Sequence, residues 1–122
     1  MSDNRNKLPV AVEIVSGGGS ASQRVGGSVT SIEDTSGGSI SLGTAKQFRV
    51  VPNLRSWTGK LFVLSYSNPA SIANAEYIVT SNIEIKDTVP PNTTLYWGLL
   101  DASTLGSTIG GSGDYLIVTR YE

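Results

Sequence analysis

The side chains that usually carry enzyme chemistry are sparse in this 122-residue sequence. Histidine and cysteine are both absent, which excludes the common zinc sites, a cysteine nucleophile and a Ser-His-Asp triad. A serine followed by a lysine, Ser56 and Lys60, is the remaining pair that could act as nucleophile and base. A serine on a turn with a lysine on the next strand is common by chance. We therefore expect a protein that is not an enzyme.

Carboxylates are the next candidates, because a pair of them can hydrolyse a glycosidic bond and a cluster can bind calcium. Five candidates lie between residues 76 and 114, but their spacing matches no stereotyped motif. The three aspartates fall at turns, where this residue commonly caps the backbone. The glycine-rich stretch 17–27 also lacks the Gly-Lys-Ser/Thr ending of a phosphate loop. We expect no metal site and no cofactor; the five carboxylates are Glu76, Glu84, Asp87, Asp101 and Asp114.

The overall charge and hydropathy exclude two kinds of partner. Nine basic and ten acidic residues give a net charge of −1, so a general attraction to nucleic acid or to an anionic membrane is not expected. The longest apolar run, residues 61–64, is far shorter than the roughly 20 residues of a membrane span. The N-terminus lacks the continuous apolar stretch of a signal peptide, which predicts a protein that is not secreted.

Charge is distributed unevenly along the chain. No acidic residue lies between Asp34 and Glu76, and this window contains four basic residues around Trp57. An exposed Arg-Ser-Trp-Thr turn has the composition of an interface hot spot. Trp57 could instead stack on a sugar, or fold back to close the end of the domain. The candidate interface residues are Arg49, Arg55, Trp57 and Lys60; the candidate glycan platform is Trp57, Tyr96 and Trp97.

The aromatic residues indicate where the packed domain lies. All nine occur from Phe48 onward, and aromatic side chains dominate the energetics of cores, so the core is expected to begin near residue 44. Short alternating segments separated by Pro, Asn and Gly predict antiparallel strands. The fold class is thus all-β, a small antiparallel β-sandwich or jelly-roll-like domain over 44–122. The expected strands are 46–51, 60–66, 76–80, 83–86, 93–100 and 114–121.

Two further segments precede this domain. In residues 16–43, 16 of 28 positions are Gly or Ser, which is typical of a flexible linker, with a short strand where Ile40 and Leu42 alternate with serines. In residues 1–15, an extended stretch places four apolar side chains on one face. Pro9 there argues against a central strand. We expect a docking arm that pairs with a neighbouring molecule by strand addition, the alternative being a first strand of the domain's own sheet; its apolar residues are Leu8, Val10, Val12 and Ile14.

The arm, linker and β-domain together resemble the accessory capsid proteins of tailed bacteriophages: decoration or cement proteins and short head fibres. The resemblance rests on the opening Lys7-Leu8-Pro9-Val10-Ala11-Val12-Glu13-Ile14-Val15-Ser16-Gly17-Gly18-Gly19 and on the strand Tyr115-Leu116-Ile117-Val118-Thr119-Arg120-Tyr121. It is architectural and transfers no residue role.

The resemblance implies a homotrimeric virion protein, made in the host cytoplasm, that contacts the major capsid protein or other virion subunits. The small domain, which has no disulfide, also favours an oligomer. The alternative is a carbohydrate- or receptor-binding β-sandwich module of a phage tail or fibre.

Overall fold

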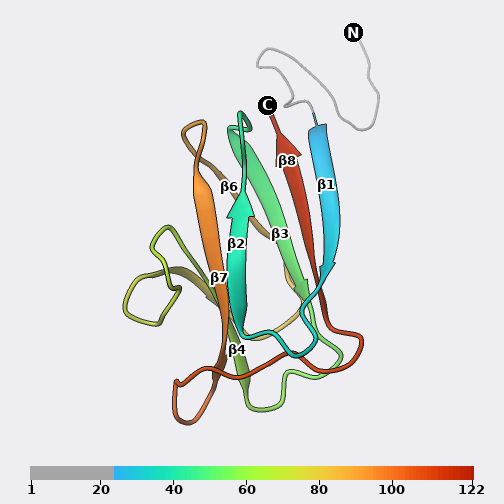
Figure 1. Cartoon of the computed structure of the whole chain (residues 1–122), viewed down its shortest axis with the longest axis vertical. Helices are drawn as coiled ribbons and strands as arrows, with labels where there is room; N and C mark the ends of the chain where they lie inside the picture. Colours follow the sequence, from blue (N-terminus) through green and yellow to red (C-terminus); the bar gives the residue numbers. More distant parts are fainter. Residues whose placement is uncertain (1–23) are drawn as a thin grey trace, which may run out of the picture.

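The computed structural model describes residues 24–122, whose regular structure is entirely β-strand (Figure 1). The expected docking arm, residues 1–15, lies outside the described residues. Eight strands form two four-stranded antiparallel sheets. They are β1 (Arg24–Ser31), β2 (Gly37–Ser41), β3 (Gln47–Asn53), β4 (Lys60–Ser65), β5 (Ala75–Val79), β6 (Ile85–Thr88), β7 (Thr94–Asp101) and β8 (Tyr115–Tyr121).

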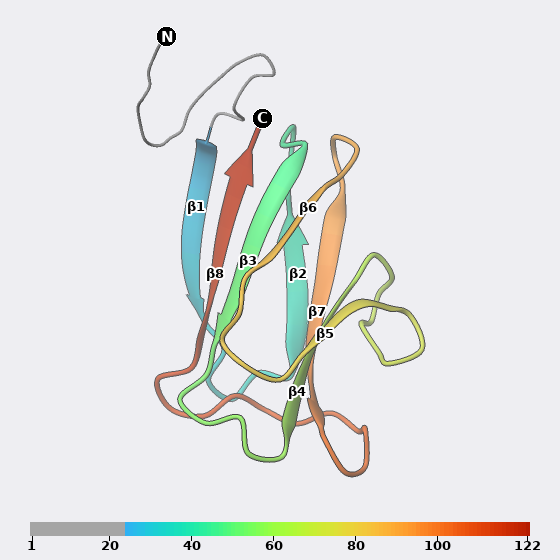
Figure 2. The same cartoon turned by 180° about the vertical axis from the view of Figure 1, so that it is seen from behind.

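The strands pair in a nested order, the first with the last. β1 pairs with β8, β2 with β7, β3 with β6 and β4 with β5. Two further pairings, β3 with β8 and β4 with β7, complete sheets of order β1-β8-β3-β6 and β2-β7-β4-β5. Figure 2 shows β8 lying between β1 and β3. An eight-stranded ladder rolled up in this way is a jelly roll, so the expected fold class is confirmed.

The core lies between the two sheets and is filled by alternate residues of each strand, because successive side chains point to opposite faces. Phe48 and Val50 of β3 come from the first sheet, and Phe62 of β4 comes from the second; all three are fully buried. The Phe62 ring stacks on Trp97 of β7, with 6.0 Å between ring centroids and 12° between planes. Burial of each such side chain stabilises the fold by about 1.5–3 kcal/mol.

The packed domain begins earlier than the expected boundary at residue 44. Residues 24–43, interpreted from their composition as part of a linker, supply both β1 and β2. Ile32, Ile40 and Leu42 are 0%, 6% and 2% exposed and belong to the core. The glycines and serines between them are tolerated because β1 and β2 are edge strands, which need backbone pairing on one side only. The short strand expected around Ile40 is confirmed as β2.

One predicted strand is displaced by two residues. The alternation of Ile83 and Ile85 predicted a strand over 83–86, whereas β6 spans Ile85–Thr88. The backbone N–H of Ile83 donates to the carbonyl oxygen of Ser81, at 2.8 Å, within a turn. Ile83 is therefore 50% exposed, while Ile85 is 4% exposed and enters the core.

The 66–74 loop covers part of the outer face of the second sheet. A Cβ added to Gly98 of β7 would lie 3.4 Å from the carbonyl oxygen of Ala70 and 3.5 Å from a methyl group of Val63. Figure 1 shows this loop in yellow-green beside β7. Val63 and Gly98 are consequently buried although they point away from the core.

Candidate functional site

The basic residues between Asp34 and Glu76 do not form one unpaired patch. Arg49 of β3 forms an ion pair with Glu84. The Nζ atom of Lys60 lies 3.8 Å from a carboxylate oxygen of Asp114. Arg55 is exposed, and its aliphatic stem lies over the loop that leads into β8. A Cβ on Gly113 of that loop would be 2.8 Å from the arginine Cδ. Arg55 and Lys60 therefore surround Asp114, whereas Arg49 lies further along β3.

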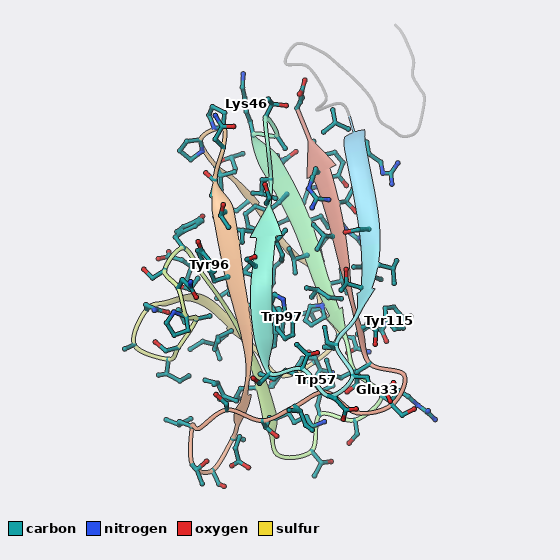
Figure 3. The ribbon with its side chains drawn as sticks, in the orientation of Figure 1. Glu33, Lys46, Trp57, Tyr96, Trp97 and Tyr115 are labelled. Carbon is teal, nitrogen blue, oxygen red and sulfur yellow. The ribbon has the colours of Figure 1, made fainter. Side chains whose placement is uncertain are left out.

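Trp57 closes the end of the sandwich. Its half-buried ring packs against the core, and its Nε1–H donates to the Oδ1 atom of Asn82, at 2.6 Å. The same Oδ1 atom accepts the backbone N–H of Leu54 at 3.0 Å, and the Asn82 amide nitrogen donates to the Leu54 carbonyl oxygen. Figure 3 shows Trp57 at the end of the domain near Glu33 and Tyr115. Of the three roles that the sequence allowed for Trp57, the structure shows the ring folded back over the end of the domain.

Asp114 is a buried carboxylate, 3% exposed, and directly precedes β8. One oxygen accepts the backbone N–H of Arg55 at 2.9 Å, and the other accepts the backbone N–H of Gly111 at 2.8 Å. The Lys60 ammonium provides a nearby positive charge. With its oxygens bonded to the backbone, Asp114 joins two loops.

The serine–lysine pair considered above is not assembled. The Ser56 hydroxyl oxygen accepts the backbone N–H of Thr58, whereas Lys60 faces Asp114.

Asp101 caps a turn by accepting the backbone N–H groups of Ser103 and Thr104. Together with a hydrogen bond from the Ser103 hydroxyl, these donors lower the pKa of Asp101 to about 2.

Tyr77 and Asp87 tie the two sheets together at one side of the sandwich. The Tyr77 hydroxyl on β5 donates a hydrogen bond to the carboxylate of Asp87 on β6. Burial and this acceptor raise the pKa of Tyr77. The hydrogen bond from Tyr77 in turn lowers the pKa of Asp87. Each shift favours the protonated phenol and the ionised carboxylate, which is the arrangement that holds the contact.

The three aromatic residues of the candidate glycan platform do not all line one surface. Tyr96 and Trp97 are neighbours on β7 and therefore point to opposite faces of the sheet. Trp97 lies between the sheets, 6% exposed, with its indole against Gly38 of β2. Trp57 is at the end of the domain (Figure 3). Tyr96 and Trp97, but not Trp57, line a groove of about 390 Å³ on the outer face of the second sheet.

The opposite side of the sandwich from the Tyr77–Asp87 contact is open. β1 and β2 are the edge strands there, and a small cleft of about 120 Å³ between them is lined by residues of both. Arg120 of β8 spans the cleft and donates from Nε to the backbone carbonyl oxygen of Ser41, at 2.9 Å. Seven of the eight residues of β1 are exposed, including Val25 at 49% and Val29 at 69%.

Sequence reasoning did not find the parts played by Asn82 and Asn68. Asn82 holds Trp57 from 25 residues away, and Asn68 helps to line the Tyr96 groove. An asparagine beside a proline or a serine reads as a turn residue, and no local signal distinguishes one that turns the chain from one that also contacts a distant element.

Among residues 24–122, no group of three or more Asp, Glu, His or Cys side chains is placed to hold a metal ion. The same part of the chain has no helix of the length and apolar character needed to cross a membrane. No protein-family model matches the sequence, and neither the curated proteins nor the solved structures contain a match to it.

Proposed function

We propose that the protein is a non-enzymatic structural subunit that attaches to a larger protein shell by strand pairing, as capsid decoration and cement proteins do. The partner in this proposal is the major capsid protein or another virion subunit. The observation that carries the proposal is the edge of β1 that has no partner strand within residues 24–122.

Three properties of β1 favour strand pairing with a neighbour. Within the described residues it pairs with β8 only, so its other edge presents backbone donors and acceptors for an added strand. Val25 and Val29 expose apolar side chains. The strand contains no proline, and its one charge is Arg24 at the first position. Natural edge strands usually carry prolines or inward-pointing charges that prevent such pairing.

The arm adds a second strand-forming segment to the same attachment surface. Leu8, Val10, Val12 and Ile14 alternate with other residues over a length similar to that of β1. In the proposal this segment lies on the neighbouring subunit, and β1 accepts a strand from it. Jelly rolls occur in viral capsid domains and in lectins, which supports a virion role by analogy of fold alone.

Deletion of residues 1–15 tests the arm. Capsids from cells that produce the protein are collected by sedimentation and probed for the full chain or for the truncated chain. We expect the full chain to sediment with the capsids and the truncated chain to remain in the supernatant, with an unchanged melting temperature because the deletion removes none of residues 24–122. Equal amounts of both chains on the capsids would refute the proposal.

Val29→Lys tests the β1 edge separately, because a charge on an edge strand opposes pairing. The matched control is Ile109→Lys, since Ile109 is 50% exposed and lies in the loop between β7 and β8 rather than on an edge strand. Weaker capsid attachment with V29K and unchanged attachment with I109K is the expected result. If the two variants attach equally well, β1 is not the attachment edge.

Trimer formation is a further part of this proposal. Light scattering of the full chain at micromolar concentration is expected to give about three times the 12.8 kDa chain mass. A monomer mass throughout this range would show that the free protein is not a trimer.

A further inference from the structure

We propose that the groove beside Tyr96 binds a short, neutral saccharide. The groove has a volume of about 390 Å³, within the range of small-molecule sites. It lies on the outer face of the second sheet, between the 66–74 loop and the edge strand β2. This site is separate from the β1 edge and does not depend on attachment to a shell.

The groove exists because two glycines face each other on adjacent strands. Gly37 of β2 is paired with Gly98 of β7, and the next outward pair on the same face is Ser39 with Tyr96. The glycine pair leaves a floor without side chains. Tyr96 and Ser39 border this floor, and Asn68 of the covering loop forms part of the opposite wall.

The chemistry of the lining selects a class of ligand. The groove is lined by no charged residue, so a phosphate or a carboxylate would lose water without gaining an ionic partner. The polar side chains are hydroxyls, one amide and one phenol, which can donate and accept hydrogen bonds without charge. A Tyr ring adds an apolar face. This combination fits a ligand with many hydroxyl groups and an apolar C–H face; its polar members are Ser36, Ser39, Asn68, Tyr96 and Ser107.

Within residues 24–122, these polar side chains have no side-chain hydrogen bond that a ligand would have to replace. Among the described residues, none of the five donates or accepts a side-chain hydrogen bond with another residue. Polar groups without protein partners that face a concave surface are typical of a binding site, because they can replace bonds to water with bonds to the ligand.

The wall of the groove is held in place by the loop's own hydrogen bonds. Asn74 accepts the backbone N–H of Ser71 at 2.9 Å and donates from Nδ2 to the Pro69 carbonyl oxygen at 2.9 Å. The Ser65 hydroxyl donates to the Asn74 carbonyl oxygen at 2.7 Å. A loop that is ordered before binding loses less conformational entropy when the ligand arrives.

The test is a titration of the isotope-labelled full chain with maltotriose, cellotriose, mannotriose and chitotriose, followed by amide chemical shifts. At least one trisaccharide is expected to shift the amides of Gly37, Ser39 and Gly98 with millimolar or tighter affinity. No shifts from any of the four sugars, or shifts confined to residues around Trp57, would overturn the proposal.

Two variants with a matched control make the assignment specific. Tyr96→Ala is expected to weaken binding by roughly tenfold or more, and Ser39→Lys is expected to weaken it by filling the groove. Tyr115→Ala is the control, because Tyr115 is a half-buried tyrosine on the other sheet. Binding that survives both groove variants, or that Y115A weakens equally, would contradict the assignment. Amide spectra of each variant establish that it is folded.

Charged sugars give a further discriminating measurement. A sulfated disaccharide of similar size is expected to bind at least roughly tenfold more weakly than the best neutral trisaccharide, because no cation lines the groove. Tighter binding of the sulfated sugar would overturn the proposed neutral ligand.

Discussion

The carboxylate of Asp114 accepts the backbone N–H of Arg55 at 2.9 Å, which joins two loops that lie 59 residues apart in the sequence. Its second oxygen accepts the backbone N–H of Gly111. A single buried carboxylate therefore fixes the loop between β3 and β4 against the loop that leads into β8. These two loops, with Trp57 between them, form one end of the sandwich.

Replacement of Asp114 by alanine is expected to destabilise the protein by about 2–4 kcal/mol, because the backbone N–H groups of Arg55 and Gly111 lose their common acceptor. Asp114→Asn is expected to lose less, since its amide oxygen can still accept one of the two. Urea denaturation measures both changes. Glu76→Ala, at an exposed carboxylate on β5, serves as the control. A D114A variant as stable as E76A would contradict this role.

Gly110 lies so close to another strand segment that a side chain cannot fit. A Cβ at this position would be 2.2 Å from the carbonyl oxygen of Ile32, and both residues are part of fixed backbone contacts. Gly110→Ala is expected to lower the melting temperature by about 10 °C or more. Gly26→Ala is the matched control, because a Cβ there meets nothing within 4 Å. Equal melting temperatures for G110A and G26A would refute the close approach.

Trp57 and Asn82 should show a measurable energetic coupling. Trp57→Phe removes one hydrogen bond to a side chain and is expected to cost about 1 kcal/mol. Asn82→Ala is expected to cost more, because Asn82 also bonds the backbone of Leu54. A double-mutant cycle by urea denaturation should give a coupling energy of about 0.5–1.5 kcal/mol. A coupling near zero would show that the contact does not stabilise the fold.

Acid stability should depend on Asp101. Its pKa is about 2 in the folded protein and 3.8 as an ordinary carboxyl, so its contribution to stability is present above pH 4 and lost as the pH falls towards 2. Asp101→Asn removes a carboxylate that titrates in this window. The stability difference between wild type and D101N should shrink from pH 5 to pH 2 in urea denaturation. A constant difference would contradict the pKa shift.

Much of the fold was predictable where burial alternates. The strands from β3 onward carry apolar residues on one face, and the expected bounds differ from the observed ones by one or two residues. That Tyr96 and Trp97 point to opposite faces of the sheet also follows from the sequence, because they are successive residues of one strand. β1 was missed because its side chains are exposed and its stability comes from backbone pairing with β8, which leaves no periodic apolar signal in Gly- and Ser-rich sequence.

The site residues were less predictable, because they depend on contacts across the fold. A basic stretch without acids predicted an exposed surface at Arg49 and Lys60, yet Glu84, just before β6, and Asp114, just before β8, pair with them. The position of Trp57 could not be predicted, because it depends on a hydrogen bond to Asn82, which lies 25 residues away in the sequence. The Tyr96 groove requires the register that sets Gly37 opposite Gly98, and that register is fixed by pairing between strands that are distant in the sequence.

The position of β8 between β1 and β3 has a consequence for biosynthesis. β1 pairs with β8 alone, and β3 takes β8 as one of its two partners. During translation the ribosome releases β8 after the other seven strands, so the first sheet cannot close before β8 has been made. Sheets built from such distant pairings also fold slowly. Nascent chains therefore expose β1 and β3 until β8 has left the ribosome, and a premature stop before Tyr115 leaves both strands without their common partner.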